Sequence, residues 1–313
     1  AMYFPYVRGK QFELIALREL CGLLPNFSTK ISPVIEPIKG SSTLKSSLKV
    51  LATKNVNFSV IINPKVGGLV GERDKIIELL KEVLEHYSNY QIAIIIDSKI
   101  EEQIPALIES INNLELNCKG VTLIHNSEIS EVSITEIQSN INVIYNIIYF
   151  SNTSRRYYRL FPEESRISLD DYFRDMPRNA DYLEVGESPF SEEYSFYKDE
   201  GFFGFSDFLT VGDNYSDSGF LPRAVAMHLS YINASGKIMV KHFVSDSNGD
   251  VSDIGGKFAE ALEKLVNWCV SNNINTKAVE VYKDLHNRGH FPGLGTLKKL
   301  SIMNHIELIV DKI

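Results

Sequence analysis

Met2-Tyr-Phe-Pro-Tyr-Val-Arg-Gly-Lys-Gln-Phe-Glu-Leu-Ile-Ala-Leu17 joins a short apolar run to an amphipathic segment, and this junction indicates how the chain folds. Residues 3–7 are typical of a buried strand, and the leucines that follow recur at the spacing of one helix face: Leu14, Leu17, Leu20 and Leu24. Arg8 and Lys10 lie between the two, and Glu13 lies in the first helical turn. Charged side chains at a strand-to-helix junction indicate a site on an α/β scaffold.

The same plan repeats through the first half of the chain. Strands are predicted at residues 3–7, 32–38, 58–63, 92–97, 121–125 and 143–150, and the helices between them at 42–54, 72–87, 101–112 and 133–138. Continuous β-branched runs between amphipathic helices are typical of parallel strands that are buried on both faces. No glycine-rich phosphate loop follows the first strand. The pattern therefore predicts a (β/α)8 TIM-type barrel, with an open doubly wound parallel sheet as the alternative.

If the barrel closes, five apolar strand residues should be buried: Val34, Ile61, Ile94, Leu123 and Ile144. The second half is less regular, with strand candidates at 166–173 and 204–212 and helices at 258–270 and 278–285. Two alternating runs flank Asn233-Ala-Ser-Gly236, which is typical of a β-hairpin. We therefore expect one barrel domain over residues 1–313, with an extra hairpin at 224–245 and C-terminal helices.

Net charge, cysteine spacing and the length of the apolar runs indicate the protein's partners and its cellular compartment. The net charge of −8 disfavours wholesale nucleic-acid binding, although a local basic patch is compatible with it. Cys21, Cys118 and Cys269 are far apart and form no CxxC pair, which favours a reducing compartment over disulfides or a zinc site. The longest apolar runs are too short to cross a bilayer. We expect a cytoplasmic protein with no membrane partner.

Polar residues follow five consecutive predicted strands, where parallel barrels carry their active sites. We expect a ligand or an anion such as a phosphate to bind at this end, through Arg8, Lys10, Glu13, Asn63, Lys65, His125 and Asn126. Glu36 and Asp97 are the candidate catalytic carboxylates, as a general base or as ligands of a divalent cation with Asn63. Taken singly, each position is more often a helix cap or part of an ion pair.

Other site signatures are weak. His286 and His290 have a metal-like spacing, but Gly289 breaks the helix that would align their rings. No GxSxG, Walker, HExxH or GxGxxG motif is present, and no cofactor is predicted, with a divalent cation kept as an alternative. Glu36→Gln is expected to alter binding and to leave the fold largely intact.

A basic, aromatic stretch at residues 154–162 is the second candidate site. Arg155, Arg156 and Arg159 alternate with Tyr157 and Tyr158, a mixture that suits contacts to a nucleic-acid backbone together with base stacking. The alternative is a solvated crossover between two barrel strands. On the first interpretation the three arginines contact a protein or nucleic-acid partner.

Three blocks of the chain resemble the "beta protein" family of bacteria and phages. They are the opening stretch, Gly204-Phe-Ser-Asp-Phe-Leu-Thr-Val-Gly212, and Ala224-Val-Ala-Met-His-Leu-Ser-Tyr231. The resemblance runs the length of the chain and implies a prokaryotic protein associated with mobile elements or anti-phage defence. Two functions stay open. We favour a recognition or scaffold component, and the alternative is a barrel enzyme that acts on a phosphorylated small molecule or a phosphodiester.

Overall fold

The apolar runs of the sequence pair side by side as parallel strands and close into a barrel. We describe residues 2–216 and 221–313 from a computed structural model. The strands follow the order β1 (Tyr6–Arg8), β2 (Val34–Glu36), β3 (Phe58–Ile61), β4 (Tyr90–Ile96), β5 (Gly120–His125), β6 (Val143–Tyr149), β7 (Arg166–Asp170) and β9 (Gly204–Asp207). Phe205 closes the ring, because its N–H donates to Met2 O and its carbonyl accepts from Phe4 N. The TIM-type barrel is thus confirmed, and the open sheet is wrong.

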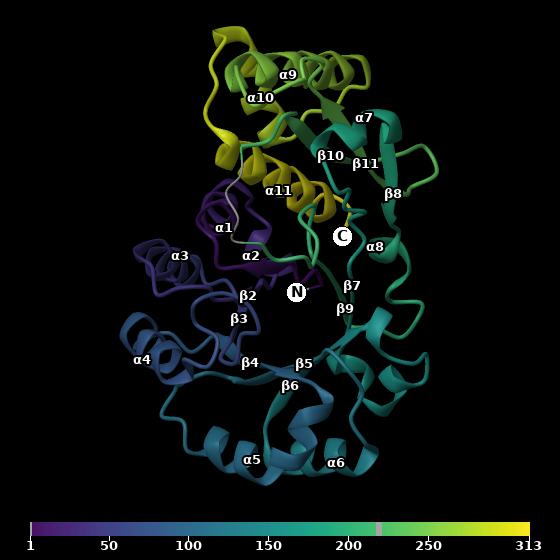
Figure 1. Cartoon of the computed structure of the whole chain (residues 1–313). Coiled ribbons are helices and arrows are strands. Elements are labelled where there is room, and N and C mark those ends of the chain that lie inside the picture. Colours follow the sequence, from purple (N-terminus) through teal and green to yellow (C-terminus); the bar gives the residue numbers. More distant parts are fainter. Residues whose placement is uncertain (1, 217–220) are drawn as a thin grey trace.

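Helices cover the outside of the first six strands (Figure 1). They are α1 (Gln11–Leu23), α2 (Phe27–Lys30), α3 (Ser42–Thr53), α4 (Arg73–Val83), the short 3-10 segment η1 (Ser98–Gln103), α5 (Ile104–Asn112) and α6 (Glu131–Asn140). Leu14, Leu17 and Leu20 of α1 are completely buried, as their spacing predicts. The Oγ of Ser41 accepts from Leu44 N and caps α3, so the sequence itself marks where this helix begins.

Alternation along the strands separates the barrel interior from the helix-facing layer. Val34, Ile61 and Ile124 pack with one another inside the barrel, whereas Ile94 and Leu123 are buried among the helices. Ile144 is only half-buried, so its predicted burial is wrong. The ladder pairs Val121 with Val143 and Thr122 with Tyr145, which makes Ile144 the extra residue of a bulge.

The second half adds a separate antiparallel sheet, called the small sheet below. The predicted hairpin forms as β10 (Ala226–Ile232) and β11 (Ile238–Val244), and β8 (Glu187–Ser191) pairs with the free side of β11. The short helices α7 (Tyr182–Val185) and α8 (Glu193–Phe196) flank β8. The segment between barrel strands β7 and β9 therefore carries a strand of the small sheet instead of a long helix.

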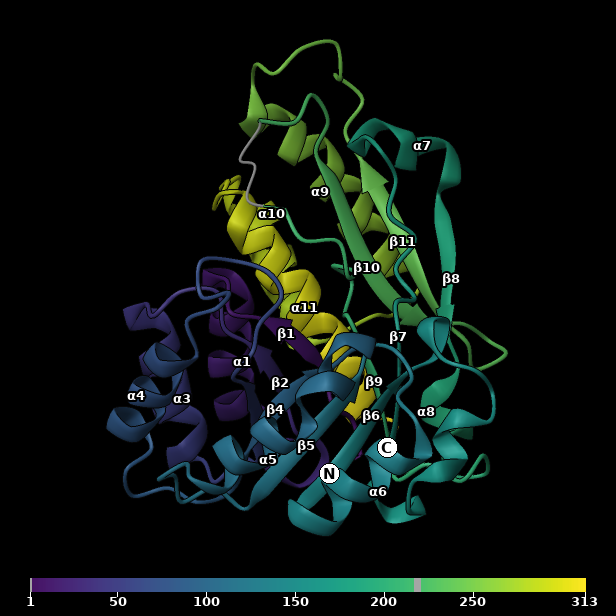
Figure 2. The ribbon, with the colours of Figure 1, turned by 60° about the horizontal axis from the view of Figure 1, so that its bottom comes forward.

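Three helices follow the hairpin: α9 (Ile254–Ser271), α10 (Lys277–Arg288) and α11 (Leu294–Val310). Figure 2 shows α11 running between α1 and the small sheet, and it packs against both α1 and β10. It takes the place of the barrel helix that would follow β9. Both sides of α11 are covered, so it has no polar stripe, and the periodicity of the sequence does not reveal its extent.

A buried polar network joins α11 to the barrel and to the small sheet. His305 Nε2 lies 3.0 Å from Asp207 Oδ2, and its Nδ1 lies 3.0 Å from Ser230 Oγ. Tyr3 OH donates to Asp207 Oδ1 over 2.7 Å. Ser230, His305 and Asp207 follow one another as in a Ser-His-Asp triad, but all three side chains are buried away from any substrate. The network is therefore structural.

Candidate functional site

A buried ion pair fills the C-terminal end of the barrel. Arg8 and Glu36 end neighbouring strands β1 and β2 in direct register, and Arg8 Nε donates to Glu36 Oε1 over 2.8 Å. Tyr6 OH donates to the same oxygen over 2.8 Å, and Lys65 N donates to Oε2 over 2.8 Å. Burial and the Glu36 carboxylate raise the pKa of Tyr6 well above its ordinary value. Both oxygens of Glu36 are thus engaged within the fold.

Asp213 completes this end of the barrel, a role that no pattern in the sequence indicates. Arg8 Nη2 donates to Asp213 Oδ1 over 3.0 Å, and Arg8 Nη1 donates to the Asp213 carbonyl over 3.2 Å. Tyr149 OH donates to Asp213 Oδ2 over 3.1 Å. Asp213 ends a strand candidate in the sequence, but nothing there indicates that its segment turns back over the barrel.

These side chains line a small pocket of about 230 Å³, called the mouth below. Its polar lining is Arg8, Glu36, Lys65, Asn126 and Asp213, and its apolar lining includes Ile95, Ile124, Leu169 and Phe208. Of the residues predicted to bind or to react, the structure therefore brings Arg8, Glu36, Lys65 and Asn126 together.

Asp97 and Lys10 lie at the same end of the barrel, beside the mouth. Asp97 Oδ2 lies 3.6 Å from Lys65 Nζ, and Asp97 Oδ1 accepts from Lys99 N, which caps η1. Lys10 Nζ donates to Ser216 O over 2.7 Å and lies 4.6 Å from the centre of the Tyr215 ring. Lys10 therefore reaches toward the segment after β9.

Glu13 and Asn63, two other predicted site residues, do not line the mouth and instead join elements of the barrel wall. Glu13 Oε1 accepts from Arg8 N over 3.3 Å, and its Oε2 pairs with Lys298 Nζ at 3.1 Å, which links α1 to α11. Asn63 exchanges two hydrogen bonds of 2.8 and 3.0 Å with the backbone of Ile95. That exchange continues the β3–β4 pairing past the end of β3.

His125 also lies outside the mouth, so its assignment there is wrong. Because Ile124 faces the barrel interior, the next side chain faces the helices. His125 Nε2 lies 3.0 Å from Asn146 Oδ1, and Tyr157 OH lies 2.8 Å from His125 Nδ1. Burial lowers the pKa of His125 to about 4, which keeps the ring neutral at pH 7.

Each cation of the mouth is already paired with a carboxylate of the protein. Arg8 pairs with Glu36 and Asp213, and Lys65 pairs with Asp97. Two cations therefore face three carboxylates. Asp171 lies behind them, where its Oδ2 accepts from Asp213 N over 2.9 Å and burial raises its pKa. As folded, the mouth offers no uncompensated cation cluster to clamp a phosphate.

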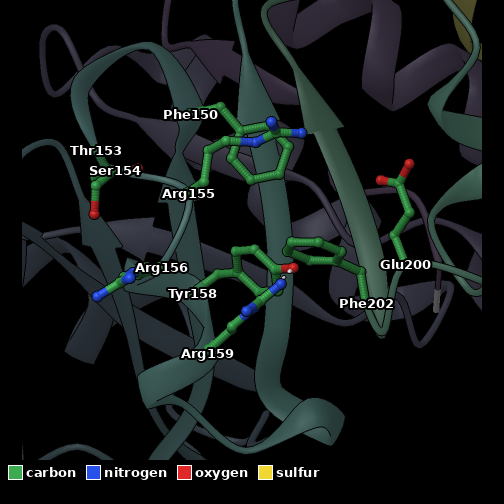
Figure 3. A pocket seen from close by; sticks show the side chains of 9 residues that line it. All are labelled: Phe150, Thr153, Ser154, Arg155, Arg156, Tyr158, Arg159, Glu200 and Phe202. Carbon is green, nitrogen blue, oxygen red and sulfur yellow. Dashed lines mark hydrogen bonds between the residues drawn. The ribbon is translucent and has the colours of Figure 1, made fainter.

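A second hollow, called the arginine groove below, is larger than the mouth. It has a volume of about 750 Å³ and is lined by Phe150, Thr153, Ser154, Arg155, Arg156, Tyr158, Arg159, Glu200 and Phe202 (Figure 3). The three arginines are exposed. In Figure 3 Arg155 lies beside the ring of Phe150 and Arg159 beside Tyr158 and Phe202. Arg156 lies apart from the rings, on the side of Thr153 and Ser154, and Glu200 lies on the opposite side.

The floor of the groove is aromatic, and its rings pack against one another. Tyr158 and Phe202 have ring centroids 4.9 Å apart, and Arg159 lies 5.7 Å from the Tyr158 ring. Tyr157 anchors the loop from below, because its buried hydroxyl contacts His125 and accepts from Ile129 N over 3.2 Å. Glu128 accepts from the N–H and the Oγ of Ser154 at 3.0 Å each. The loop is therefore held in one place while its arginines face solvent.

Within residues 2–216 and 221–313, no three His, Cys, Asp or Glu side chains gather closely enough to hold a metal ion. In the same part of the chain, no helix combines the length and the apolar character needed to cross a membrane.

Known proteins resemble this chain only distantly. No family model matches the chain, and no curated protein matches it. Among solved structures, an N-acetylneuraminate lyase from Mycoplasma synoviae is 14% identical, with 99% of this chain and 97% of that chain covered and a TM-score of 0.40. A malate synthase from Haloferax volcanii is 12% identical, with 96% of each chain covered and a TM-score of 0.26.

Proposed function

We propose that this protein is a recognition component that binds single-stranded nucleic acid in the arginine groove. The observation that carries the proposal is that Arg155, Arg156 and Arg159 line the same hollow of about 750 Å³ as the rings of Phe150, Tyr158 and Phe202. Arginines suit phosphate oxygens, and aromatic rings suit the faces of unpaired bases. A hollow of this volume is within the range that small-molecule sites occupy, so it has room for a nucleotide.

Charge supports a local site of this kind. The whole chain carries −8, so long-range attraction does not bring a polyanion to every surface. The groove is an exception, since three arginines there face one carboxylate, Glu200. We therefore expect binding through a few phosphate contacts that depends strongly on salt.

The alternative, an enzyme at the mouth, has weaker support. A general base needs a carboxylate oxygen that can accept the substrate's proton. Both oxygens of Glu36 already accept hydrogen bonds from Tyr6, Arg8 and Lys65, and Asp97 caps a helix and pairs with Lys65. We also propose that the protein is cytoplasmic and that its role is linked to mobile elements or anti-phage defence. Free thiols at Cys21, Cys118 and Cys269 are compatible with the former.

Replacing Arg155, Arg156 and Arg159 together by Ala is expected to weaken binding of a fluorescent oligodeoxythymidine by about tenfold or more at low salt. The slope of log K against log salt should fall by about 0.7 for each phosphate contact that is lost. Fluorescence anisotropy across a potassium chloride series measures both quantities. Tyr158→Leu, which removes a ring and keeps the charge, should weaken binding with no change in slope.

A matched control removes three exposed lysines elsewhere, by changing Lys49, Lys54 and Lys119 to Ala. It lowers the net charge by the same amount and should leave binding nearly unchanged. Equal losses in both triple variants would mean non-specific attraction. Either that result or wild-type protein that does not bind the oligonucleotide at low salt contradicts the proposal.

A further inference from the structure

The segment at residues 208–216, called the strap below, carries a carboxylate into the mouth from far along the chain. Asp213 Oδ1 accepts from Arg8 Nη2, its carbonyl accepts from Arg8 Nη1, and its Oδ2 accepts from Tyr149 OH. A guanidinium and a phenol that converge on two carboxylate oxygens form the usual arrangement around a bound organic anion. We propose that the mouth binds a small carboxylate or phosphate, and that Asp213 occupies the anion position in this structure.

Arg8 is held in place without help from Asp213. Its Nε donates to Glu36, and its guanidinium carbon lies 5.4 Å from the Tyr6 ring and 5.7 Å from the Phe208 ring. Glu36 is fixed in turn by Tyr6 OH and Lys65 N. Moving Asp213 away would therefore leave the Nη atoms of Arg8 aimed into the mouth, as a preorganised anion site requires.

Asp213 is the less firmly held partner of the pair. Its side chain is 42% exposed, whereas that of Arg8 is 9% exposed. Water reaches the Asp213 carboxylate, so it can leave Arg8 at a lower desolvation cost than a fully buried partner, and an external anion can compete for Arg8. The exchange also keeps the charge constant, since a monoanion replaces one aspartate.

The rest of the mouth indicates the ligand. A volume of about 230 Å³ fits a molecule of a few heavy atoms. Lys65 and Asn126 offer further polar contacts, while Ile124 and Leu169 line an apolar side. This lining suits an anionic group that bears a short apolar chain. The site is separate from the arginine groove and does not depend on the function proposed there.

Isothermal titration calorimetry with two probes, inorganic phosphate and propionate, tests the proposal. Asp213→Asn removes the competing charge and should raise the affinity for at least one probe by about tenfold over the wild type. The probe whose affinity rises identifies the anion as a phosphate or a carboxylate. Adding Tyr149→Phe to Asp213→Asn should lower that affinity by severalfold with an unchanged melting temperature, because one donor is lost.

Asp246→Asn is the control, because it frees Lys264, a partly exposed lysine, from its 2.7 Å ion pair. It should produce no gain for either probe. The proposal is overturned if Asp213→Asn raises the affinity for neither probe, or raises it no more than Asp246→Asn does. If adding Tyr149→Phe leaves the affinity unchanged, the anion binds outside the mouth, and the proposal is overturned as well.

Discussion

Glu36→Gln is expected to lower the free energy of unfolding by about 3–5 kcal/mol, the usual cost of removing one partner from a buried ion pair. Glu36 is 1% exposed, and its two oxygens accept from Tyr6 OH, Arg8 Nε and Lys65 N. An amide there leaves the Arg8 cation without its nearest counter-charge and turns an N–H group toward donors. Urea denaturation followed by circular dichroism measures the loss.

Glu82→Gln is the matched control for this prediction. Glu82 pairs with Lys45 at 3.4 Å, but the two side chains are 61% and 38% exposed, so the loss should be below about 1 kcal/mol. Equal stability of the two variants would show that the Arg8–Glu36 pair contributes nothing to the fold. The sequence-based expectation that Glu36→Gln leaves the fold largely intact is replaced by this one, since Glu36 is a buried core residue.

Acid is expected to destabilise the protein between about pH 6.5 and pH 4. Burial lowers the pKa of His125 to about 4, whereas an unfolded histidine titrates near 6.5. As the pH falls through this window, the unfolded state takes up a proton that the folded state does not accept. The stabilisation is therefore complete above about pH 6.5 and is lost toward pH 4. One pKa unit corresponds to about 1.4 kcal/mol, so His125 alone accounts for up to roughly 3 kcal/mol.

Two further buried histidines also make the folded protein less stable as the pH falls. His228 and His242 lie with their Nδ1 atoms 2.9 Å apart in the small sheet, and burial lowers the pKa of both. Urea denaturation at several pH values gives the slope of stability against pH. His125→Gln should reduce that slope by about one proton in this window. A His125→Gln slope equal to that of the wild type would contradict the prediction.

The first six strands and the helices after them could be predicted because their side chains are buried in a regular order. Uninterrupted runs such as Ile92 to Ile96 fit only a strand covered on both faces. The small sheet was harder to predict from the sequence. The hairpin had its Asn/Gly turn, but β8 is a short edge strand that contains Pro189 and shows no alternation.

The candidate site was predicted only in part, because strand ends alone do not give the direction of a side chain. Glu36 shares the inward face of Val34, while His125 follows the inward Ile124 and therefore faces the helices. Counting in steps of two from the apolar interior residues separates these cases. Asp213 could not be found in this way, since it reaches Arg8 through a strap that has no periodicity.

The position of α11 has a consequence for how the chain folds during synthesis. Strand β9 closes the barrel, yet the helix that covers α1 is made only after the hairpin, α9 and α10. Until the ribosome has released α11, the apolar face of α1 that packs on it stays open to water. Contacts between segments so distant in sequence form slowly, because a long loop must first close. A chaperone that holds apolar surfaces would therefore find α1 exposed for most of translation.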